Sequence, residues 1–332
     1  MKETVYIFSS GKFKRKDNTL LFLAGEEEKK RFIPVERIKE ILIFGEVDLN
    51  KRVLEFLSQK EIILSYFNYY GWYMGSFYPR EHYNSGFMIL KQAAAYENYE
   101  KRLIIAKQFI VGAGKNTLKI LKYYNRRGRR LDEQIEKIEK NLEDLKTKTT
   151  IETSMAIEGD NKKIYYDGFN EIINDDEFTF TKRTRRPPKD YLNSLISFAN
   201  SMIYNAVLGE IYQTHLDPRI AFLHSTNFRR FSLNLDVAEI FKPIIGDRTI
   251  FSLLNKGVIT EKSFEKGLNG IMLKTTAKQK FLKAMEERYK QTIQHSTLKK
   301  KVSYRRLIRM ELYKLEKDLM NEKEYKAFVM DW

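Results

Sequence analysis

Three side chains in this sequence have the chemical types that together would hold a divalent metal ion. Glu158 follows the mainly apolar residues 155–157, and His224 follows the apolar residues 221–223. Glu239 lies within a further largely apolar segment. Carboxylate oxygens favour Mg²⁺ or Mn²⁺, and an imidazole shifts the preference towards Mn²⁺ or a similar transition ion. Because the three residues are far apart along the chain, their spacing suggests a metal site without establishing one.

A fourth acid stands close to Glu239. Asp236 precedes it by three residues, so both carboxylates share one face if residues 233–243 form a helix. We expect Pro243 to end that helix, because proline has no backbone N–H and disfavours helical geometry in the residue before it. Structural roles stay open at this point. A single histidine after an apolar run is usually a partly buried packing residue, and a single acid is usually an ion-pair partner.

The elements that must position these side chains differ between the two parts of the chain. Residues 1–80 predict a small β-rich domain of β-branched and aromatic runs separated by glycine turns, with one helix capped by Asn50. Residues 81–90 are expected to form a hinge. From residue 91 apolar residues recur every three or four positions, which predicts a larger all-α-helical domain over 91–332. The predicted fold class is therefore α+β. Strands are expected at 5–8, 19–23, 41–44, 62–67 and 72–77, and helices at 131–147, 190–214, 235–242 and from 262 to the end.

The composition restricts both the chemistry and the partner. The chain has 332 residues with 60 Lys and Arg against 44 Asp and Glu, a formal net charge of +16. This surplus favours a polyanionic partner, and no long apolar run or basic amphipathic helix favours a membrane. The absence of cysteine excludes disulfides, cysteine-ligated metal centres and thiol nucleophiles. With no apolar leader after Met1, we expect a cytoplasmic protein.

Clusters of basic residues are the candidates for contact with the polyanion. Arginine forks bind phosphate through two parallel hydrogen bonds, and Gly128 would let the backbone approach closely. Many of these cations could equally be solvated surface groups. Residues 112–117 are not interpreted as a phosphate-binding loop, because they lack the glycine spacing and interrupt a helical pattern. The candidate DNA-binding residues are Arg126, Arg127, Arg129, Arg130, Lys182, Arg183, Arg185, Arg186, Arg305 and Arg306.

Separate blocks of the sequence together resemble a known family. Residues 186–195 are followed in order by 216–218, 222–224 and 232–243, and residues 157–159 and 165–166 precede them. The order and spacing of these blocks closely resemble the CRISPR-associated integrase/endonuclease of spacer acquisition. The N-terminal strands and the terminal residues 325–328 are similar too, so the resemblance covers essentially the whole chain. Asn161 and Ala327 depart from the family's usual residues, and neither is at a ligand position.

The resemblance implies an activity, a metal site and partners. Members of the family join the 3′-hydroxyl of a short foreign DNA fragment to a phosphodiester of a CRISPR array, and they also cut or rejoin branched DNA. The positions that match the family's ligands are Glu158, His224 and Glu239, with Mg²⁺ or Mn²⁺ as the ion. Asp236 would be a further catalytic acid, as a supporting or alternative ligand. The resemblance also implies a homodimer formed through the β-rich domains, and a small companion subunit of the CRISPR adaptation complex.

Two other functions share part of this pattern. A transposon-type integrase of the same superfamily would use the same residues, and only its DNA target would distinguish it. A non-catalytic scaffold for branched DNA would show steep salt dependence without metal-dependent turnover. The intact trio of Glu158, His224 and Glu239 argues against the scaffold.

Overall fold

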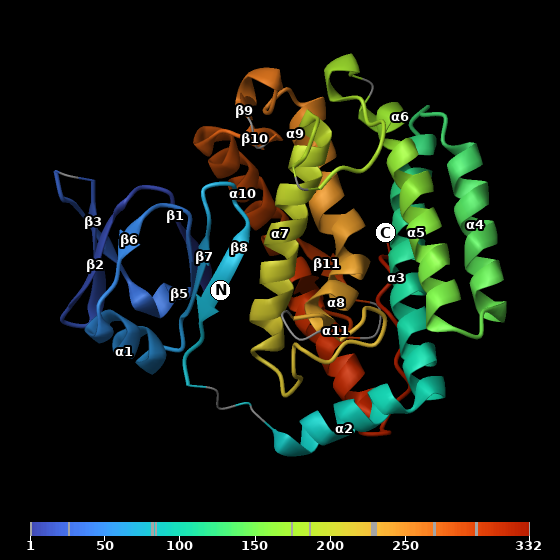
Figure 1. Cartoon of the computed structure of the whole chain (residues 1–332), viewed down its shortest axis with the longest axis horizontal. Helices are drawn as coiled ribbons and strands as arrows, with labels where there is room; N and C mark the ends of the chain where they lie inside the picture. Colours follow the sequence, from blue (N-terminus) through green and yellow to red (C-terminus); the bar gives the residue numbers. More distant parts are fainter. Residues whose placement is uncertain are drawn as a thin grey trace. The chain divides into compact units, whose positions relative to one another are not determined.

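The chain divides into two compact units, Met1–His82 and Tyr83–Trp332. The computed structural model describes residues 2–25, 27–80, 83, 85–173, 175–185, 187–226, 231–267, 270–295 and 298–331. Figure 1 shows that the first unit is rich in strands and the second is mainly helical. This mixture of strands and helices agrees with the α+β prediction. Within the described ranges, no helix is both long and apolar enough to cross a membrane.

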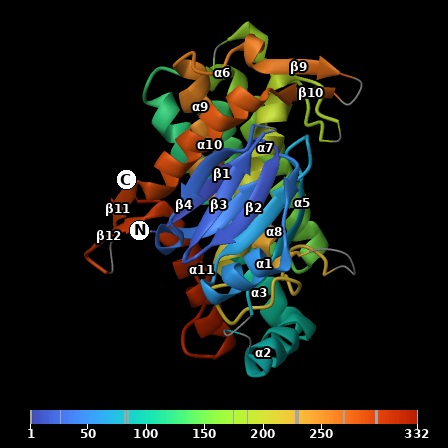
Figure 2. The same cartoon turned by 90° about the vertical axis from the view of Figure 1, so that its left-hand side faces the viewer.

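Two four-stranded sheets and one helix make up the first unit. The first sheet has the strand order β1-β5-β7-β8, with parallel pairs except for β7–β8. The second has the order β4-β3-β2-β6, and Figure 2 shows β4, β3 and β2 side by side. The bounds are β1 Glu3–Ile7, β2 Gly11–Lys16, β3 Thr19–Ala24, β4 Lys29–Ile33, β5 Ile38–Ile43, β6 Val47–Asp48, α1 Lys51–Gln59, β7 Ile63–Phe67 and β8 Tyr73–Phe77.

The hydrophobic core of the first unit is shared by both sheets and α1. Ile41 of the first sheet, Phe22 of the second and Phe56 of α1 are buried in one cluster. The helix begins as predicted, because the Asn50 side chain accepts a hydrogen bond from the backbone N–H of Val53 at 3.1 Å. The apolar runs of the sequence therefore form the strands and helix that enclose this core.

The sequence does not predict β2 and β4, whose residues are mostly Lys and Arg. Each is a strand because it pairs with the apolar β3, where Phe13 of β2 lies opposite Phe22. Phe13 is buried and the basic residues around it are exposed, so a single inward side chain per strand is enough once a partner strand is present.

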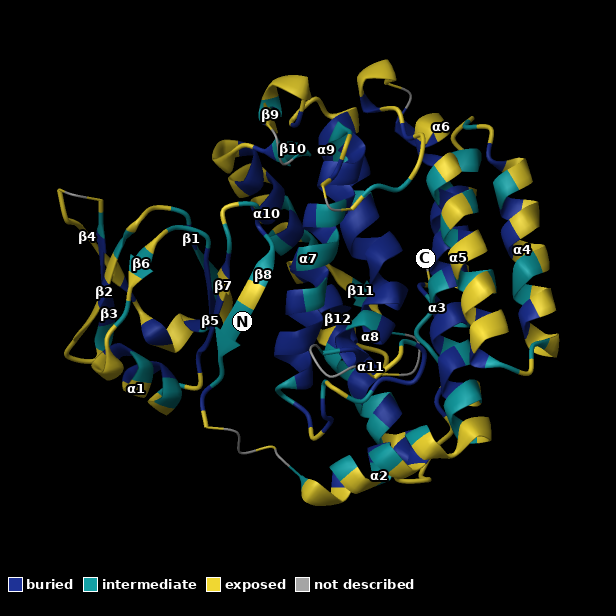
Figure 3. Cartoon of the chain, viewed as in Figure 1, coloured by how far each residue is buried: buried dark blue, intermediate teal, exposed yellow. Residues whose placement is uncertain are grey.

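The second unit is built from packed helices. Figure 3 shows that α7 is buried along nearly its whole length, whereas α4 exposes its charged positions. The helices are α2 Gly86–Glu97, α3 Tyr99–Asn125, α4 Asp132–Thr147, α5 Ile151–Asp167, α6 Phe169–Ile173, α7 Tyr191–Ile211, α8 Leu233–Phe241, α9 Arg248–Asn255, α10 Thr275–Lys290 and α11 Tyr304–Leu319.

Three sequence-based expectations for this unit are wrong. It is not all-helical, because β9 (Phe264–Gly267) pairs with β10 (Gly270–Leu273), and β11 (Thr292–Gln294) pairs with β12 (Lys301–Ser303). These hairpins interrupt the wholly helical stretch that was predicted from residue 262 to the end. The predicted hinge over 81–90 is also too long, since α2 begins at Gly86 with Ser85 as its cap.

Pro243 does not end the helical path as predicted. Residues Lys242–Asp247 continue from α8 as a π-helical segment that leads directly into α9. The wider turn tolerates a proline near its start, because the first residues of a helical segment need no backbone donor. The segment carries Lys242 and Asp247 into the region of Glu239.

Candidate metal and nucleic-acid site

The loop that carries His224 is organised around a buried carboxylate. Asp236, on α8, accepts hydrogen bonds from the backbone N–H groups of Phe222, Leu223 and His224 at 2.7, 2.9 and 2.9 Å. Its Oδ1 also lies 2.7 Å from Nδ1 of the His224 ring. Both oxygens of this fully buried side chain are thus used within the loop. The ring is held with Nδ1 towards Asp236, which leaves Nε2 as the nitrogen able to bind an ion.

Two side chains from the preceding helices fix the same loop from its other side. Gln92, on α2, accepts a hydrogen bond from the backbone N–H of Asp217 at 2.9 Å and donates to the carbonyl oxygen of Ile220 at 2.7 Å. Arg102, on α3, donates from Nε to the carbonyl oxygen of Phe222 at 3.0 Å. The imidazole is therefore positioned by a loop with few degrees of freedom.

Glu158 and Glu239 converge on one ammonium group. Lys162, one turn after Glu158 on α5, forms ion pairs with Glu158 and with Glu239, whose Oε2 lies 3.0 Å from its Nζ. Lys242 lies on the other side of Glu239, 2.6 Å from Nζ to Oε1. Two carboxylates and two ammonium groups thus alternate across α5, α8 and the π-helical segment.

Close packing on α3 brings these elements together. A Cβ atom at Gly112 would lie 2.7 Å from the Cβ of Ala327 and 3.2 Å from Cγ1 of Ile240, the residue after Glu239. Asn116, which is also buried, donates to the carbonyl oxygen of Ile240 at 2.9 Å. The glycine pattern that faintly resembled a phosphate loop therefore lies inside a continuous helix, where it permits α8 to approach α3.

Burial and charge act in opposite directions on these groups. Burial disfavours ionisation of Glu239, but Lys162 and Lys242 overcome it and lower the pKa of the carboxyl from 4.5 to about 2. Burial likewise opposes the charge of Lys162, and Glu239 outweighs it so that the pKa of Lys162 is raised. For His224, burial is outweighed by the hydrogen bond to Asp236 and by the charges of Asp236 and Glu239, so its pKa is raised. Glu239 is therefore ionised at neutral pH.

A cavity of about 40 Å³ adjoins the two carboxylates. Its lining includes Glu158, Lys162, Glu239, Lys242 and Asp247. Burial raises the pKa of Asp247 to about 7, and the charge of Lys242 only partly opposes this. The cavity is large enough for an ion or a few water molecules but not for a nucleotide.

The donor set fits a hard or borderline divalent ion. Within the described ranges, no three His, Asp or Glu side chains already surround one point. Glu158 and Glu239 instead face a position that a cation, the Lys162 ammonium, already occupies. The buried Glu239, the half-buried Glu158 and the His224 imidazole, which is oriented by Asp236 and interacts with the charge of Glu239, are the ligand types that Mg²⁺ or Mn²⁺ needs, provided that Lys162 turns aside.

The predicted DNA-binding residues lie in different environments. Arg126, Arg127, Arg129 and Arg130 lie at the turn between α3 and α4, where most are exposed, and Lys182, Arg185 and Arg306 are exposed as well. Arg183 donates to Asn193 Oδ1 at 2.7 Å and to Ser197 Oγ at 2.9 Å. Arg186 lies outside the described residues.

Arg305 does not fit the prediction of a surface contact. It is only 9% exposed, and its guanidinium forms an ion pair with the buried Glu210. Its charge is used inside the unit because α11 packs against α7 there. The sequence offers no sign of this, since Arg305 and the exposed Arg306 are neighbours within one basic run.

Sequence reasoning missed several residues of the site. Lys162 and Lys242 follow Glu158 and Glu239 at helical spacings of four and three residues, a signal that could have linked them. Gln92, Arg102 and Asp247 had no such local signal, because their partners are distant in the sequence or their burial depends on the fold.

Comparison with known proteins identifies the family. The family model for CRISPR associated protein Cas1 matches residues 5–287. The chain is 57% identical over 332 residues to the CRISPR-associated endonuclease Cas1 2 of Thermodesulfovibrio yellowstonii, with 100% of both chains covered. It is 47% identical to a solved Cas1 protein from Thermotoga maritima, with a TM-score of 0.87 over 98% of this chain and 99% of that one.

The chain therefore belongs to the Cas1 family, and the resemblance noted from its sequence blocks is confirmed. A casposase bound to integration product has a TM-score of 0.88 at 22% identity, over 98% of this chain and 93% of that one. At that identity the likeness shows a shared fold.

Proposed function

We propose that this chain is a divalent-metal-dependent DNA endonuclease and integrase. It would join the 3′-hydroxyl of foreign DNA fragments to a phosphodiester of a CRISPR array, and it would also act on branched DNA. The observation that carries the proposal is the convergence of Glu158 and Glu239, from different helices, on a single half-buried cation position. The membership of the Cas1 family and the endonuclease names of its relatives support the same reading.

Glu158, His224 and Glu239 would hold Mg²⁺ or Mn²⁺. When bound, the ion would supply charge neutralisation at the attacked phosphate and help to activate the attacking hydroxyl. Lys162 and Lys242 keep Glu239 ionised and so ready to bind at neutral pH. Asp236 has both oxygens committed to the His224 loop, so we assign it a positioning role and not that of a ligand.

The basic surplus would hold the DNA around this site. The turn between α3 and α4, with Arg126, Arg127, Arg129 and Arg130, is the densest exposed cluster of the predicted set, and Lys182, Arg185 and Arg306 would add to it. Homodimer formation through the β-rich unit and assembly with a small companion subunit complete the proposal. Both follow from the family resemblance.

One assay tests the activity and its target. The protein is incubated with and without the companion subunit, with 3′-hydroxyl DNA fragments and a plasmid carrying a CRISPR array, in Mn²⁺ or in EDTA. We expect joining at the repeat boundary in Mn²⁺ and none in EDTA. Glu158→Gln, His224→Ala and Glu239→Gln should abolish it, while Glu171→Gln, at an exposed acid of α6, should not.

The other outcomes separate the alternatives. Joining that requires the ends of a mobile element and ignores the array would indicate a transposon-type integrase. Binding of branched DNA without turnover in any metal would indicate a scaffold. Retained joining by all three ligand variants would refute the site.

A further inference from the structure

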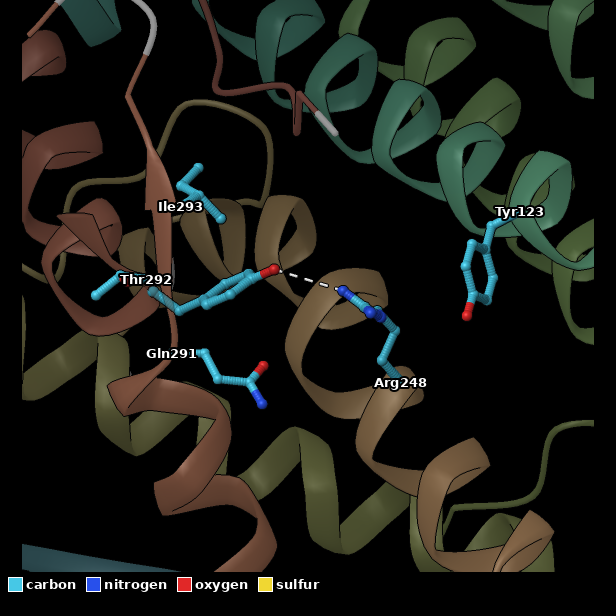
Figure 4. A pocket seen from close by; sticks show the side chains of 6 residues that line it. Tyr123, Arg248, Gln291, Thr292 and Ile293 are labelled. Atoms are coloured by element: carbon cyan, nitrogen blue, oxygen red, sulfur yellow. Dashed lines mark hydrogen bonds between the residues drawn. The ribbon is translucent and has the colours of Figure 1, made fainter. Parts of the chain in front are cut away.

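A second cavity in the helical unit is separate from the carboxylate site. Its volume is about 310 Å³, and its lining shares no residue with the cavity beside Glu158 and Glu239. Figure 4 shows Arg248, the first residue of α9, reaching into the space between Tyr123 of α3 and the residues of β11. The lining residues are Tyr123, Arg248, Gln291, Thr292, Ile293 and Tyr304.

Positive charge is concentrated at this cavity. Arg248 donates to the Tyr304 hydroxyl at 3.4 Å, and Arg288 donates to Oε1 of the lining residue Gln291 at 2.9 Å. Burial lowers the pKa of Arg288, and the positive charge of Arg248 lowers it further. Among the described residues that line the cavity, none is acidic. Two like charges kept together beside such a lining favour an anionic ligand, and guanidinium groups suit phosphate.

The aromatic residues of the lining indicate a ligand that has a ring as well as a negative charge. The Tyr123 ring carries the Arg127 guanidinium 4.5 Å from its centroid, in the basic cluster at the end of α3. A half-exposed tyrosine beside arginine is a common stacking surface for a nucleic-acid base, and an amide such as that of Gln291 can bind a base edge. The volume lies at the lower end of the range for small-molecule sites, which suits one nucleotide.

We propose that this cavity binds a single nucleotide of a DNA strand, with its phosphate at Arg248 and Arg288 and its base against Tyr123. The proposal rests on the proposed DNA function and adds a strand contact away from the metal site. A nucleotide held here would also lie next to the cluster at Arg126–Arg130, because Tyr123 lines the cavity and its ring contacts Arg127 of that cluster.

Photocrosslinking tests the contact directly. Branched DNA with 5-iododeoxyuridine in its single-stranded arms is irradiated with the full-length protein, and the crosslinked peptides are mapped by mass spectrometry. We expect a crosslink at Tyr123 that Arg248→Gln removes. In parallel, Arg248→Gln should weaken binding of the same DNA about tenfold and reduce the slope of log K against log salt by about 0.7 to 0.9, as for one lost phosphate contact.

The controls separate a local contact from loss of charge or fold. Lys256→Gln removes one exposed positive charge at the other end of α9 and should change affinity far less. Tyr123→Phe keeps a ring and should bind DNA as the unmodified protein does, while Tyr123→Ala should not. Circular dichroism melting checks that each variant is folded.

Several results would overturn the proposal. Crosslinks confined to other peptides would do so, as would equal binding by Arg248→Gln and Lys256→Gln. Competition of the labelled DNA with dAMP and with inorganic phosphate identifies the ligand. Binding of dAMP that depends on Arg248, without any crosslink to DNA, would mean that the cavity binds a free nucleotide and not a DNA strand. Glu239→Gln should keep the crosslink while losing strand joining, so a failure of the catalytic proposal is recognised separately.

Discussion

The ammonium of Lys162 is the side chain whose removal tests the carboxylate site most sharply. It pairs with both Glu158 and Glu239, and its side chain is 29% exposed, so water can reach only part of it. Lys162→Met removes the charge while keeping most of the volume of the side chain. Lys163→Met is a matched control, because it removes the same charge from the next, exposed position of α5.

The pKa of Glu239 sets the size of the effect. Burial opposes its charge, and Lys162 is the largest of the influences that overcome burial and bring the pKa from 4.5 to about 2. An acid whose pKa is lowered by folding stabilises the fold above its unfolded pKa, and that contribution is lost as the pH falls towards the folded value. At about 1.4 kcal/mol per pH unit, the contribution is about 3 kcal/mol. Since breaking a buried pair costs about 3–5 kcal/mol and Lys242 stays in place, we expect a loss of about 3 kcal/mol.

Guanidinium unfolding followed by circular dichroism measures this loss at a series of pH values. At pH 7, Lys162→Met should be about 3 kcal/mol less stable than the unmodified protein, and Lys163→Met should differ by less than about 0.5 kcal/mol. The gap should narrow between pH 5 and pH 3, because the unmodified protein loses a larger Glu239 contribution there than the variant, in which Lys242 alone of the two lysines still opposes burial. Mn²⁺ should raise the melting temperature of Lys162→Met more than that of the unmodified protein. A gap independent of pH, or no larger than that of Lys163→Met, would refute the reasoning.

Four further changes have expected outcomes. Asp236→Asn should lower the pKa of His224, measured by NMR titration, and should lower the free energy of unfolding by about 2–3 kcal/mol through lost hydrogen bonds to the loop. In the unmodified protein the raised pKa of His224 stabilises the fold below pH 6.5, and this stabilisation is lost as the pH rises through the pKa of His224 in the folded state. The variant should not show this pH-dependent stabilisation. Asp247→Asn should become more stable than the unmodified protein as the pH rises from 4 to 8, by up to about 4 kcal/mol, because the pKa of about 7 means that folding resists the ionised acid. Calorimetry should show Gly112→Ala destabilised by about 1–3 kcal/mol through the close approach of Ala327 and Ile240. Gly159→Ala, with open space around its Cβ, should be stabilised by about 0.5–1 kcal/mol.

The fold was predictable wherever the pattern of apolar residues within one segment shows which side chains are buried. The strands of apolar residues follow from a period of two residues, and the long amphipathic helices follow from a period of three to four. The cap follows from the residue type of Asn50. The charged strands β2 and β4 and the two hairpins of the second unit were not predictable in this way. They depend on pairing with a partner strand, and the energy of that pairing is absent from any local window.

The candidate site likewise has a part that the sequence predicts and a part that depends on the fold. The residue types and their apolar approaches singled out Glu158, His224 and Glu239, and these now lie on elements that pack together. The roles of their neighbours depended on contacts between distant segments. Asp236 is bound to a loop twelve to fourteen residues earlier, although its sequence context resembles that of an ordinary site acid. Arg305 is buried against Glu210, although its sequence context resembles that of an ordinary surface arginine.

The sequence by itself determined the family, the two-part organisation, the basic surplus and the acid and imidazole groups available for a metal. Those properties are carried by residue identity and order, which need no coordinates. Only the tertiary structure decided that Lys162 sits between Glu158 and Glu239, and that Arg248 lines a second cavity where Arg288 donates to the lining residue Gln291. Charge acts through distance in space and through burial, and folding sets both by bringing together helices that the sequence keeps apart.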